Sequence, residues 1–377
     1  MEKRIFHATS IILSRSIYAL NWYNVSPLFI FIGPSLAISL SQLGLVPTFF
    51  LIGAGVFQIP AGIISSKIGP KKTAMIGMYI LSIFTILTGF SWNIYSILIF
   101  RLIVGIGAAF YFSPAIGILK NLFEQRRVGL AMGFYNAAFN LGAGIAVLTW
   151  STVAQIFGWR EALIISGVIG IIITIENHLT LPEPKQEKTG KLREVLTNRN
   201  VILLGIALAG FWGAYFATAQ LLFTYLVKER EISNIIAGSI SSLILFSGVV
   251  GGPLGGYVHD ILGRGKLLLA ILGIISSILI LSIFMASTIL TFIIVILIGI
   301  VAVSIFSILY AMPARYKEIS EEYIPLSIGM INSLQISIGS IAPFLFTYIS
   351  DKFSFNFGWI FLGIFVLVFL PFLLFIK

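Results

Sequence analysis

The chain has 377 residues, of which 58% are hydrophobic and only 10% are charged, and its 24 basic residues outnumber its 14 acidic ones. A water-soluble domain carries about 25% charged residues because its surface must be hydrated, so this composition excludes a soluble globule and favours a surface that faces lipid. Cysteine is absent, which excludes a disulfide framework and a thiolate metal site.

Apolar segments fill the chain up to its longest hydrophilic stretch. They match the roughly 20 residues that a helix needs to cross the hydrocarbon layer. A spanning segment must satisfy its own backbone hydrogen bonds, which predicts helices here and not strands. Turn residues and charges delimit these helices at about 10–36, 45–66, 73–90, 94–119, 128–156 and 160–180.

The hydrophilic stretch between Leu181 and Asn200 carries eight charges. Further apolar segments follow at about 201–227, 234–258, 266–286, 289–313, 323–349 and 355–376. The sequence therefore predicts an all-α membrane protein with twelve transmembrane helices. Its predicted parts are an N-terminal six-helix bundle over 1–181, a cytoplasmic linker over 182–199 and a C-terminal six-helix bundle over 200–377.

The basic residues predict the orientation in the membrane, because cytoplasmic loops carry an excess of Lys and Arg. With the N-terminus inside, 18 of the 24 basic residues fall on the cytoplasmic side and two lie within helices. Both termini are therefore expected in the cytoplasm, with the protein in the plasma membrane. The net charge of +10 follows from this bias, so no nucleic-acid partner is expected. The four basic residues of the opposite side are Arg160, Lys228, Arg230 and Lys352.

Two local sequences recur in the two halves, which indicates a parallel repeat of six helices. Gly133-Phe-Tyr-Asn136 in the fifth predicted helix matches Gly329-Met-Ile-Asn332 in the eleventh. The loops after the second and eighth helices also match. They read Gly62-Ile-Ile-Ser-Ser66-Lys67-Ile-Gly69-Pro-Lys71-Lys72 and Gly256-Tyr-Val-His-Asp260-Ile-Leu-Gly263-Arg264-Gly-Lys266.

These loops resemble the signature of the major facilitator superfamily, Gly-x-x-x-Asp-Arg/Lys-x-Gly-Arg-Lys/Arg, and the resemblance extends over the whole chain. Arg101-Leu-Ile-Val-Gly105-Ile-Gly107 in the fourth helix is similar to a second family motif, Arg-x-x-x-Gly-x-Gly. The resemblance implies two pseudo-symmetric bundles, a solute site between them and transport by alternating access. The chain departs from the family signature at Ser66, which replaces the expected acid, and at Ile261, which replaces a base.

The loop residues are expected to act as a conformational switch. The glycines would permit tight turns and close helix approach. The charges would pair with the ends of neighbouring helices in one conformation and so bias the balance between inward and outward states. The alternative interpretation is that these are ordinary positive-inside charges with turn glycines. The switch residues are Gly62, Lys67, Gly69, Lys71, Lys72, Gly256, Asp260, Gly263 and Arg264.

Charged residues within predicted helices are the next candidates, since an intramembrane charge costs roughly 2.5–3.5 kcal/mol at a helix centre. Arg101 lies about 10 Å from the outer end of its helix, at about 1.5 Å per residue, and is predicted to attract an anionic group. The alternative is an arginine bonded to backbone carbonyls at a helix-packing seam. Arg15 and Glu176 lie near helix ends, where both are expected to extend to the cytoplasmic headgroups.

Neutral polar residues complete the predicted solute site. An amide in lipid needs a hydrogen-bond partner or a wet cavity, so these side chains should point inward; hydrogen bonding between helices is the alternative role. Prolines 27, 60, 114, 253 and 343 are expected to kink their helices. The neutral site residues are Asn21, Asn24, Asn136, Asn140, Tyr215, Thr218, Gln220, Tyr310, Asn332 and Gln335.

These features together predict a secondary active or facilitative transporter and not an enzyme. No phosphate-binding Gly-x-x-x-x-Gly-Lys-Ser/Thr loop occurs, and no cofactor or metal is expected. Asn140-Leu-Gly142-Ala-Gly144 resembles the Asn- and Gly-rich segments of nitrate and related anion porters, and with Arg101 it favours a small anion. The open alternatives are a multidrug or metabolite exporter of the same fold, or a channel or receptor. Coupling to an ion, uniport and exchange stay open; the expected form is a monomer in the lipid bilayer.

Overall fold

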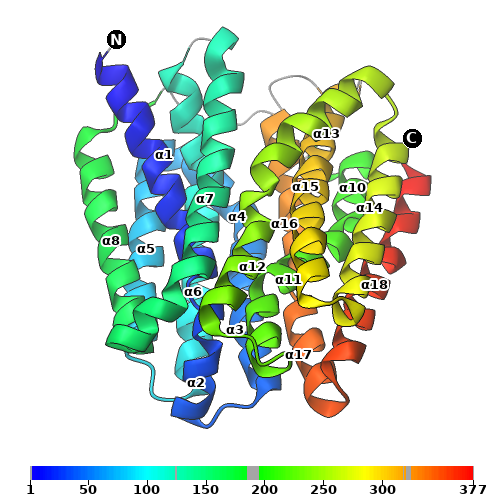
Figure 1. Ribbon diagram of the computed structural model, residues 1–377. Coiled ribbons are helices and arrows are strands. Elements are labelled where there is room, and N and C mark those ends of the chain that lie inside the picture. Colours follow the sequence, from blue (N-terminus) through cyan, green and yellow to red (C-terminus); the bar gives the residue numbers. More distant parts are fainter. Residues whose placement is uncertain (1, 124, 185–194, 317, 320–323, 377) are drawn as a thin grey trace. The chain divides into compact units, whose positions relative to one another are not determined.

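The computed structural model describes residues 2–123, 125–184, 195–316, 318–319 and 324–376, and the described part of the chain contains helices and no strand. Figure 1 shows these helices running side by side within each part of the chain. The first part forms α1 (Glu2–Tyr23), the 3-10 turn η1 (Ser26–Leu28), α2 (Phe29–Leu36), α3 (Leu40–Val56), α4 (Gln58–Ile68), α5 (Pro70–Gly89), α6 (Ile94–Leu122), α7 (Gln125–Phe157) and α8 (Trp159–Thr180).

The second part begins at Arg199, and most of the predicted linker, residues 182–199, lies outside the described residues. Its helices are α10 (Arg199–Ala207), α11 (Ala209–Lys228), α12 (Asn234–Phe246), α13 (Gly248–Leu262), α14 (Gly265–Ser282), η2 (Ile283–Met285), α15 (Thr288–Ala311), η3 (Met312–Arg315), α16 (Ile324–Gly339), α17 (Ala342–Lys352), α18 (Phe355–Phe369) and η5 (Leu370–Phe375).

Many of these helices are long enough to span a membrane. In the described ranges, ten helical segments are long and apolar enough to cross a membrane, or eleven if the bent pair α3 and α4 is one span. The first predicted span, 10–36, is divided among α1, η1 and α2 and so is not one continuous helix. The predicted class, an all-α membrane protein, is confirmed.

Prolines explain where several of the spans break. A proline inside a helix lacks an N–H group, and its ring clashes with the carbonyl four residues earlier. In three of the predicted spans a helix ends four residues before a proline. The break between α3 and α4 bends this pair by 44°. By contrast, α6 and α13 continue through Pro114 and Pro253. The last helical residues and their prolines are Tyr23 and Pro27, Val56 and Pro60, and Gly339 and Pro343.

The helices pack into two compact units. Unit 1 comprises Met1–Leu36 and Phe49–Thr189, and unit 2 comprises Ala37–Thr48 and Gly190–Lys377. In unit 1, α5 packs against α6 and α8, and α1 packs against α7; in unit 2, α13 packs against α15, and α14 against α15 and α18. The segment 37–48 belongs to unit 2 because it packs on α17, where the Ser41 hydroxyl donates to the Asp351 carboxylate at 2.9 Å.

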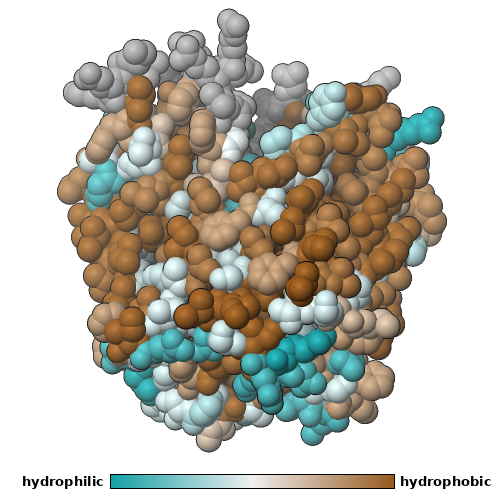
Figure 2. Space-filling model, viewed as in Figure 1, coloured by the Kyte–Doolittle hydropathy of each residue, from teal (hydrophilic) through white to brown (hydrophobic). Residues whose placement is uncertain are grey.

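The outer surface is mostly apolar. Figure 2 shows hydrophobic side chains over most of the visible face and hydrophilic ones gathered near the helix ends. Leu179, Met285 and Ile289 are each exposed by 78–79%. Such exposure is costly in water but favourable in lipid, so the surface fits a protein embedded in a bilayer.

Candidate functional site

The motif in α6 packs this helix against two neighbours. A Cβ at Gly105 would overlap the carbonyl oxygen of Phe50 on α3, and a Cβ at Gly107 would lie 2.6 Å from the backbone nitrogen of Leu81 on α5. Two residues along a helix turn the chain by about 200°, so the spacing Gly-x-Gly presents one glycine to each neighbour. The two glycines therefore bring the backbones of α3, α5 and α6 close together.

Arg101 is fully buried beside the end of α1. Its Nη1 and Nη2 atoms donate to the Asn21 carbonyl at 3.4 and 3.5 Å, and its guanidinium carbon lies 4.7 Å from the centre of the Phe50 ring. The last carbonyls of a helix lack partners within the helix, and α1 ends at Tyr23. The contacts of Arg101 match the packing-seam alternative, in which it caps this helix end with a positive charge.

Asn21 and Asn24 form a polar link between α1 and α8. The Ser166 hydroxyl donates to Asn21 Oδ1 at 2.9 Å, and Asn24 Nδ2 lies 2.8 Å from that hydroxyl and 3.2 Å from Asn21 Oδ1. All three side chains are buried. These bonds hold two helices of unit 1 together, which is the interhelical role that competes with solute binding.

Arg15 occupies a different position from the one expected. Because α1 begins at Glu2 and not near residue 10, Arg15 lies well inside the helix and is only 5% exposed, so the expected extension to the headgroups is wrong. Its guanidinium carbon lies 4.5–5.1 Å from the centres of four aromatic rings. We call this cluster the Arg15 cage; its rings are Tyr18, Phe112, Tyr135 and Phe139.

The Arg15 cage assembles from α1, α6 and α7, and sequence reasoning missed it. A local signal was present, since Arg15 and Tyr18 are three residues apart on α1, and Tyr135 and Phe139 are four apart on α7; residues at these spacings share a helix face. Among the described residues, Arg15 Nε and Nη1 make no hydrogen bond. The guanidinium is thus surrounded by rings, and two of its donor nitrogens have no hydrogen-bond partner among the described residues.

Unit 2 brings three predicted residues together. Tyr310 on α15 donates to Asn332 Oδ1 at 3.0 Å, and Gln335 Nε2 lies 3.0 Å from that oxygen and 3.2 Å from the Tyr310 hydroxyl. Tyr215 on α11 joins this group through Phe306, whose ring packs between the Tyr215 and Tyr310 rings at 5.9 and 6.1 Å. The result is a cluster of aromatic and amide side chains from α11, α15 and α16.

The other predicted site residues are more dispersed. Asn136 is exposed, and its carbonyl accepts from Asn140 Nδ2 at 3.4 Å. Thr218 donates to the Ala214 carbonyl of its own helix at 2.8 Å, a bond that occupies its hydroxyl locally. Gln220 is buried with 1% exposure. Asn136 and Asn140 belong to unit 1, and Thr218 and Gln220 belong to unit 2.

The glycines of the two loop motifs fall into two kinds. The second glycine of each copy has a positive φ, +96° at Gly69 and +65° at Gly263, which favours glycine because other residues clash there. The first glycine has room: a Cβ at Gly62 meets nothing within 4 Å, and one at Gly256 meets only the Ser307 hydroxyl at 3.9 Å. The second glycine of each loop thus lies in a turn that favours glycine, whereas the first glycine has room for a side chain.

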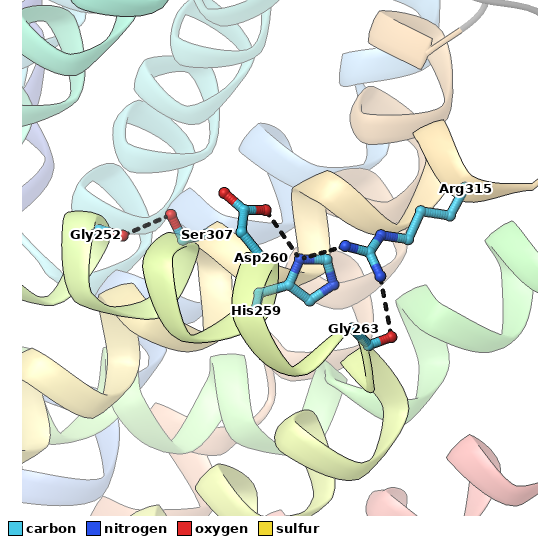
Figure 3. A network of polar contacts seen from close by, with 6 residues as sticks. All are labelled: Gly252, His259, Asp260, Gly263, Ser307 and Arg315. Carbon is cyan, nitrogen blue, oxygen red and sulfur yellow. Dashed lines mark hydrogen bonds and ion pairs between the residues drawn. The ribbon is translucent and has the colours of Figure 1, made fainter.

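Figure 3 shows the polar contacts around the second loop. Arg315 reaches from η3 to the end of α13, where Nη1 donates to the Gly263 carbonyl at 3.0 Å and Nη2 lies 3.4 Å from His259 Nδ1. The Asp260 carboxylate is 3.9 Å from the same nitrogen, and its side chain is 81% exposed. The residue that caps this helix end is therefore Arg315, which the sequence did not single out.

The basic residues of the motifs lie at helix ends. In the first loop the Ser66 hydroxyl, at the position of the expected acid, donates to the Ile63 carbonyl of its own helix at 2.7 Å, so it links no neighbouring helix. Lys67 lies in the last turn of α4 and Lys71 and Lys72 in the first turn of α5, while Arg264 is exposed between α13 and α14.

Acidic groups do not gather into a site. Among the described residues, no three His, Cys, Asp or Glu side chains are placed to hold a metal ion. Glu176 on α8 accepts hydrogen bonds from Ser10 on α1 and from Thr180 and Asn177 on its own helix. Its carboxylate is therefore held between two helices and does not simply extend to the headgroups.

Comparisons with known proteins agree with this architecture. The family model described as Major Facilitator Superfamily matches residues 11–335. The crystal structure of a bacterial homolog to human lysosomal transporter Spinster, in an inward-facing and unoccupied conformation, superposes with a TM-score of 0.80, covering 99% of this chain and 97% of that one. Its sequence identity is 16%, so this likeness shows the fold.

Curated relatives share 24–27% sequence identity with part of the chain. The chain is 26% identical to the "Probable L-galactonate transporter" of Escherichia coli (strain K12), covering 61% of this chain and 56% of that protein. It is 27% identical to the "Probable galactarate/D-glucarate transporter GarP" of the same strain, covering 55% of each. It is 24% identical to the "Probable nitrate transporter NarT" of Staphylococcus epidermidis, covering 69% and 68%. The chain thus spans about half the length of the first two relatives.

Proposed function

Because the chain belongs to the Major Facilitator Superfamily, we propose that it carries a small anion across a membrane by alternating access. The relatives that match it are named as transporters of L-galactonate, of galactarate or D-glucarate, and of nitrate. All of these solutes are anions at neutral pH. Similarity to transporters of one charge class supports the same class of solute here.

The observation that carries this proposal is buried positive charge in unit 1. Arg15 and Arg101 are 5% and 0% exposed, and both lie inside helices. Among the described residues, no salt bridge pairs either of them with a carboxylate. A cation without a carboxylate partner in an apolar interior is costly, and a bound anion would offset part of that cost at Arg15, whereas Arg101 also donates to the Asn21 carbonyl. A cationic or neutral solute would gain nothing from this arrangement.

The predicted organisation forms part of the proposal. The two six-helix halves, 1–181 and 200–377, would alternate about the linker 182–199, with Tyr310, Asn332 and Gln335 among the solute-facing residues of unit 2. One chain supplies both repeats, which supports a monomer.

The proposed orientation, with both termini in the cytoplasm of a plasma-membrane protein, rests on the 18 cytoplasmic basic residues. The natural absence of cysteine makes a clean probe possible. Thr189→Cys, in the linker outside the described residues, should react with an impermeant maleimide only in inside-out vesicles. Glu229→Cys, in an exposed loop after α11, should react only from outside intact cells. The reverse pattern would overturn the orientation.

The solute class can be tested directly on purified protein. In proteoliposomes loaded with D-galactonate, external radiolabelled D-galactonate should accumulate by counterflow, and D-glucarate or nitrate should compete. D-galactose, a neutral sugar of the same size, is the matched control and should not compete. Absence of counterflow with D-galactonate, D-glucarate and nitrate would refute anion transport, and counterflow of a cationic drug in its place would favour the exporter alternative.

A further inference from the structure

The Arg15 cage resolves how a guanidinium can be buried without an acid. A cation near the centre of an aromatic ring is attracted by the ring's negative face, and four rings lie within 4.5–5.1 Å of the Arg15 carbon. The rings stabilise the charge, and the Tyr18 and Tyr135 hydroxyls lie near Arg15, yet Nε and Nη1 make no hydrogen bond of standard geometry among the described residues. The cage therefore reduces the electrostatic cost of burying Arg15 and leaves its hydrogen bonding incomplete.

Unused donors are the second observation. Buried polar groups in proteins almost always have a hydrogen-bond partner, because leaving one without a partner costs free energy. Nε and Nη1 of Arg15 have none among the described residues. A guanidinium directs its N–H groups outward in one plane. Nε and Nη1 point to different sides, so each open donor can bond to a separate oxygen of a bound solute.

Hydroxyl groups beside the cage extend the same site. The Tyr135 hydroxyl lies close enough to Arg15 and to Tyr111 to interact with both, and Ser14 is as close to Tyr111. Yet the buried Tyr135 hydroxyl and Ser14 Oγ make no hydrogen bond of standard geometry among the described residues. Neutral hydroxyls of this kind donate to and accept from solute hydroxyls.

We propose that the Arg15 cage binds the carboxylate of a small hydroxy acid, an inference that rests on the anion transport proposed above. A carboxylate oxygen accepts from Nη1 of Arg15, a second solute oxygen accepts from Nε, and Tyr135 and Ser14 bond to the solute's hydroxyl groups. One arginine matches one carboxylate in charge. Nitrate satisfies the guanidinium but has no hydroxyl group for Tyr135 or Ser14, so a hydroxy acid fits the cluster better.

The burial of the rings indicates where the solute approaches. Tyr18 and Tyr135 are 1% and 0% exposed and form the inner wall, whereas Phe112 and Phe139 are only partly buried and form the outer wall. Side chains at the surface change rotamer more freely than buried ones. Entry of the acid therefore requires Phe112 or Phe139 to swing aside, and the inner wall stays in place.

The test measures D-galactonate affinity by isothermal titration calorimetry on purified wild-type protein and variants. Arg15→Gln, which removes the charge, should weaken binding at least 100-fold. Arg15→Lys keeps the charge but loses the planar set of donors and should weaken binding about 10-fold. Tyr135→Phe removes one hydroxyl and should weaken D-galactonate severalfold while leaving nitrate unchanged. The control Arg160→Gln removes an arginine that stacks on Trp159 outside the cage and should bind like wild type.

The outcomes separate the two proposals. If wild-type protein binds no acid, anion transport is refuted and this inference falls with it. If wild type binds D-galactonate and folded Arg15→Gln or Arg15→Lys binds it equally well, anion transport stands and the cage serves packing only. Should Arg15→Gln not fold, Arg15→Lys and Tyr135→Phe decide: unchanged affinity in both refutes the cage as a site. Equal effects of Tyr135→Phe on D-galactonate and nitrate refute the hydroxy-acid assignment.

Discussion

Gly107 offers the sharpest test of the packing in unit 1. A Cβ there would lie 2.6 Å from the Leu81 nitrogen and 2.7 Å from the Gly77 carbonyl oxygen on α5. The first distance is about 0.8 Å short of the 3.4 Å at which ordinary contact begins. Every obstructing atom belongs to the backbone, so no side chain can turn away. Gly107→Ala must therefore push α5 and α6 apart.

The expected magnitude combines two opposing effects. Overpacking of this kind costs typically 1–3 kcal/mol, while alanine in place of glycine favours a helix by about 1 kcal/mol. Gly107→Ala should therefore lower the free energy of unfolding by up to about 2 kcal/mol. Gly133→Ala on α7, where a Cβ meets nothing within 4 Å, keeps only the favourable effect and should raise it by about 0.5–1 kcal/mol.

Intrinsic tryptophan fluorescence during heating measures both variants, since the chain has six tryptophans and no cysteine for thiol dyes. The Tm of Gly107→Ala should fall below that of wild type, and the Tm of Gly133→Ala should equal or exceed it. A Gly107→Ala protein as stable as Gly133→Ala would show that α5 and α6 do not approach this closely, and the account of the Gly-x-Gly spacing would be wrong.

Three further variants probe the loops and the α1 end. Asp260→Asn should slow transport more than it weakens solute binding, by shifting the balance between conformations; unchanged turnover would make the motif a simple turn. Gly263→Ala should cost about 1–2 kcal/mol, because its φ of +65° disfavours other residues. Gly256→Ala, inside α13 with room for a Cβ, should instead raise stability by about 0.5–1 kcal/mol; equal thermal stability of the two variants would refute this difference. Arg101→Gln should lower the Tm of the solute-free protein by removing the donor to the Asn21 carbonyl, while solute affinity changes little; a stable variant with lost affinity would return Arg101 to the solute site.

Much of the fold could be predicted because its causes are local. Apolar length sets the spans, and prolines set the helix ends at Tyr23, Val56 and Gly339, four residues before each ring. The meeting of Asn332 and Gln335 also follows from a local rule, as residues three apart share a helix face. Their contact with Tyr310 required only that the polar faces of two helices turn toward each other.

The Arg15 cage shows what the sequence left out. The sequence predicts a first helix from about residue 10, since charged residues precede it, yet α1 begins at Glu2. Arg15 therefore lies in the interior of a helix and not near its end. The remaining walls come from Phe112 and Tyr135, about a hundred residues away, and no local pattern reports which rings will surround a given side chain.

The packing of residues 37–48 on α17 has a consequence for the order of folding. The Ser41–Asp351 bond joins positions 310 residues apart, and closing so long a loop is entropically costly unless much of the chain is already ordered. During synthesis the segment 37–48 leaves the ribosome long before its partner exists. The segment 37–48 therefore lacks its partner α17 until late in synthesis. Unit 2 is completed only when α17 has been made and packs against this early segment.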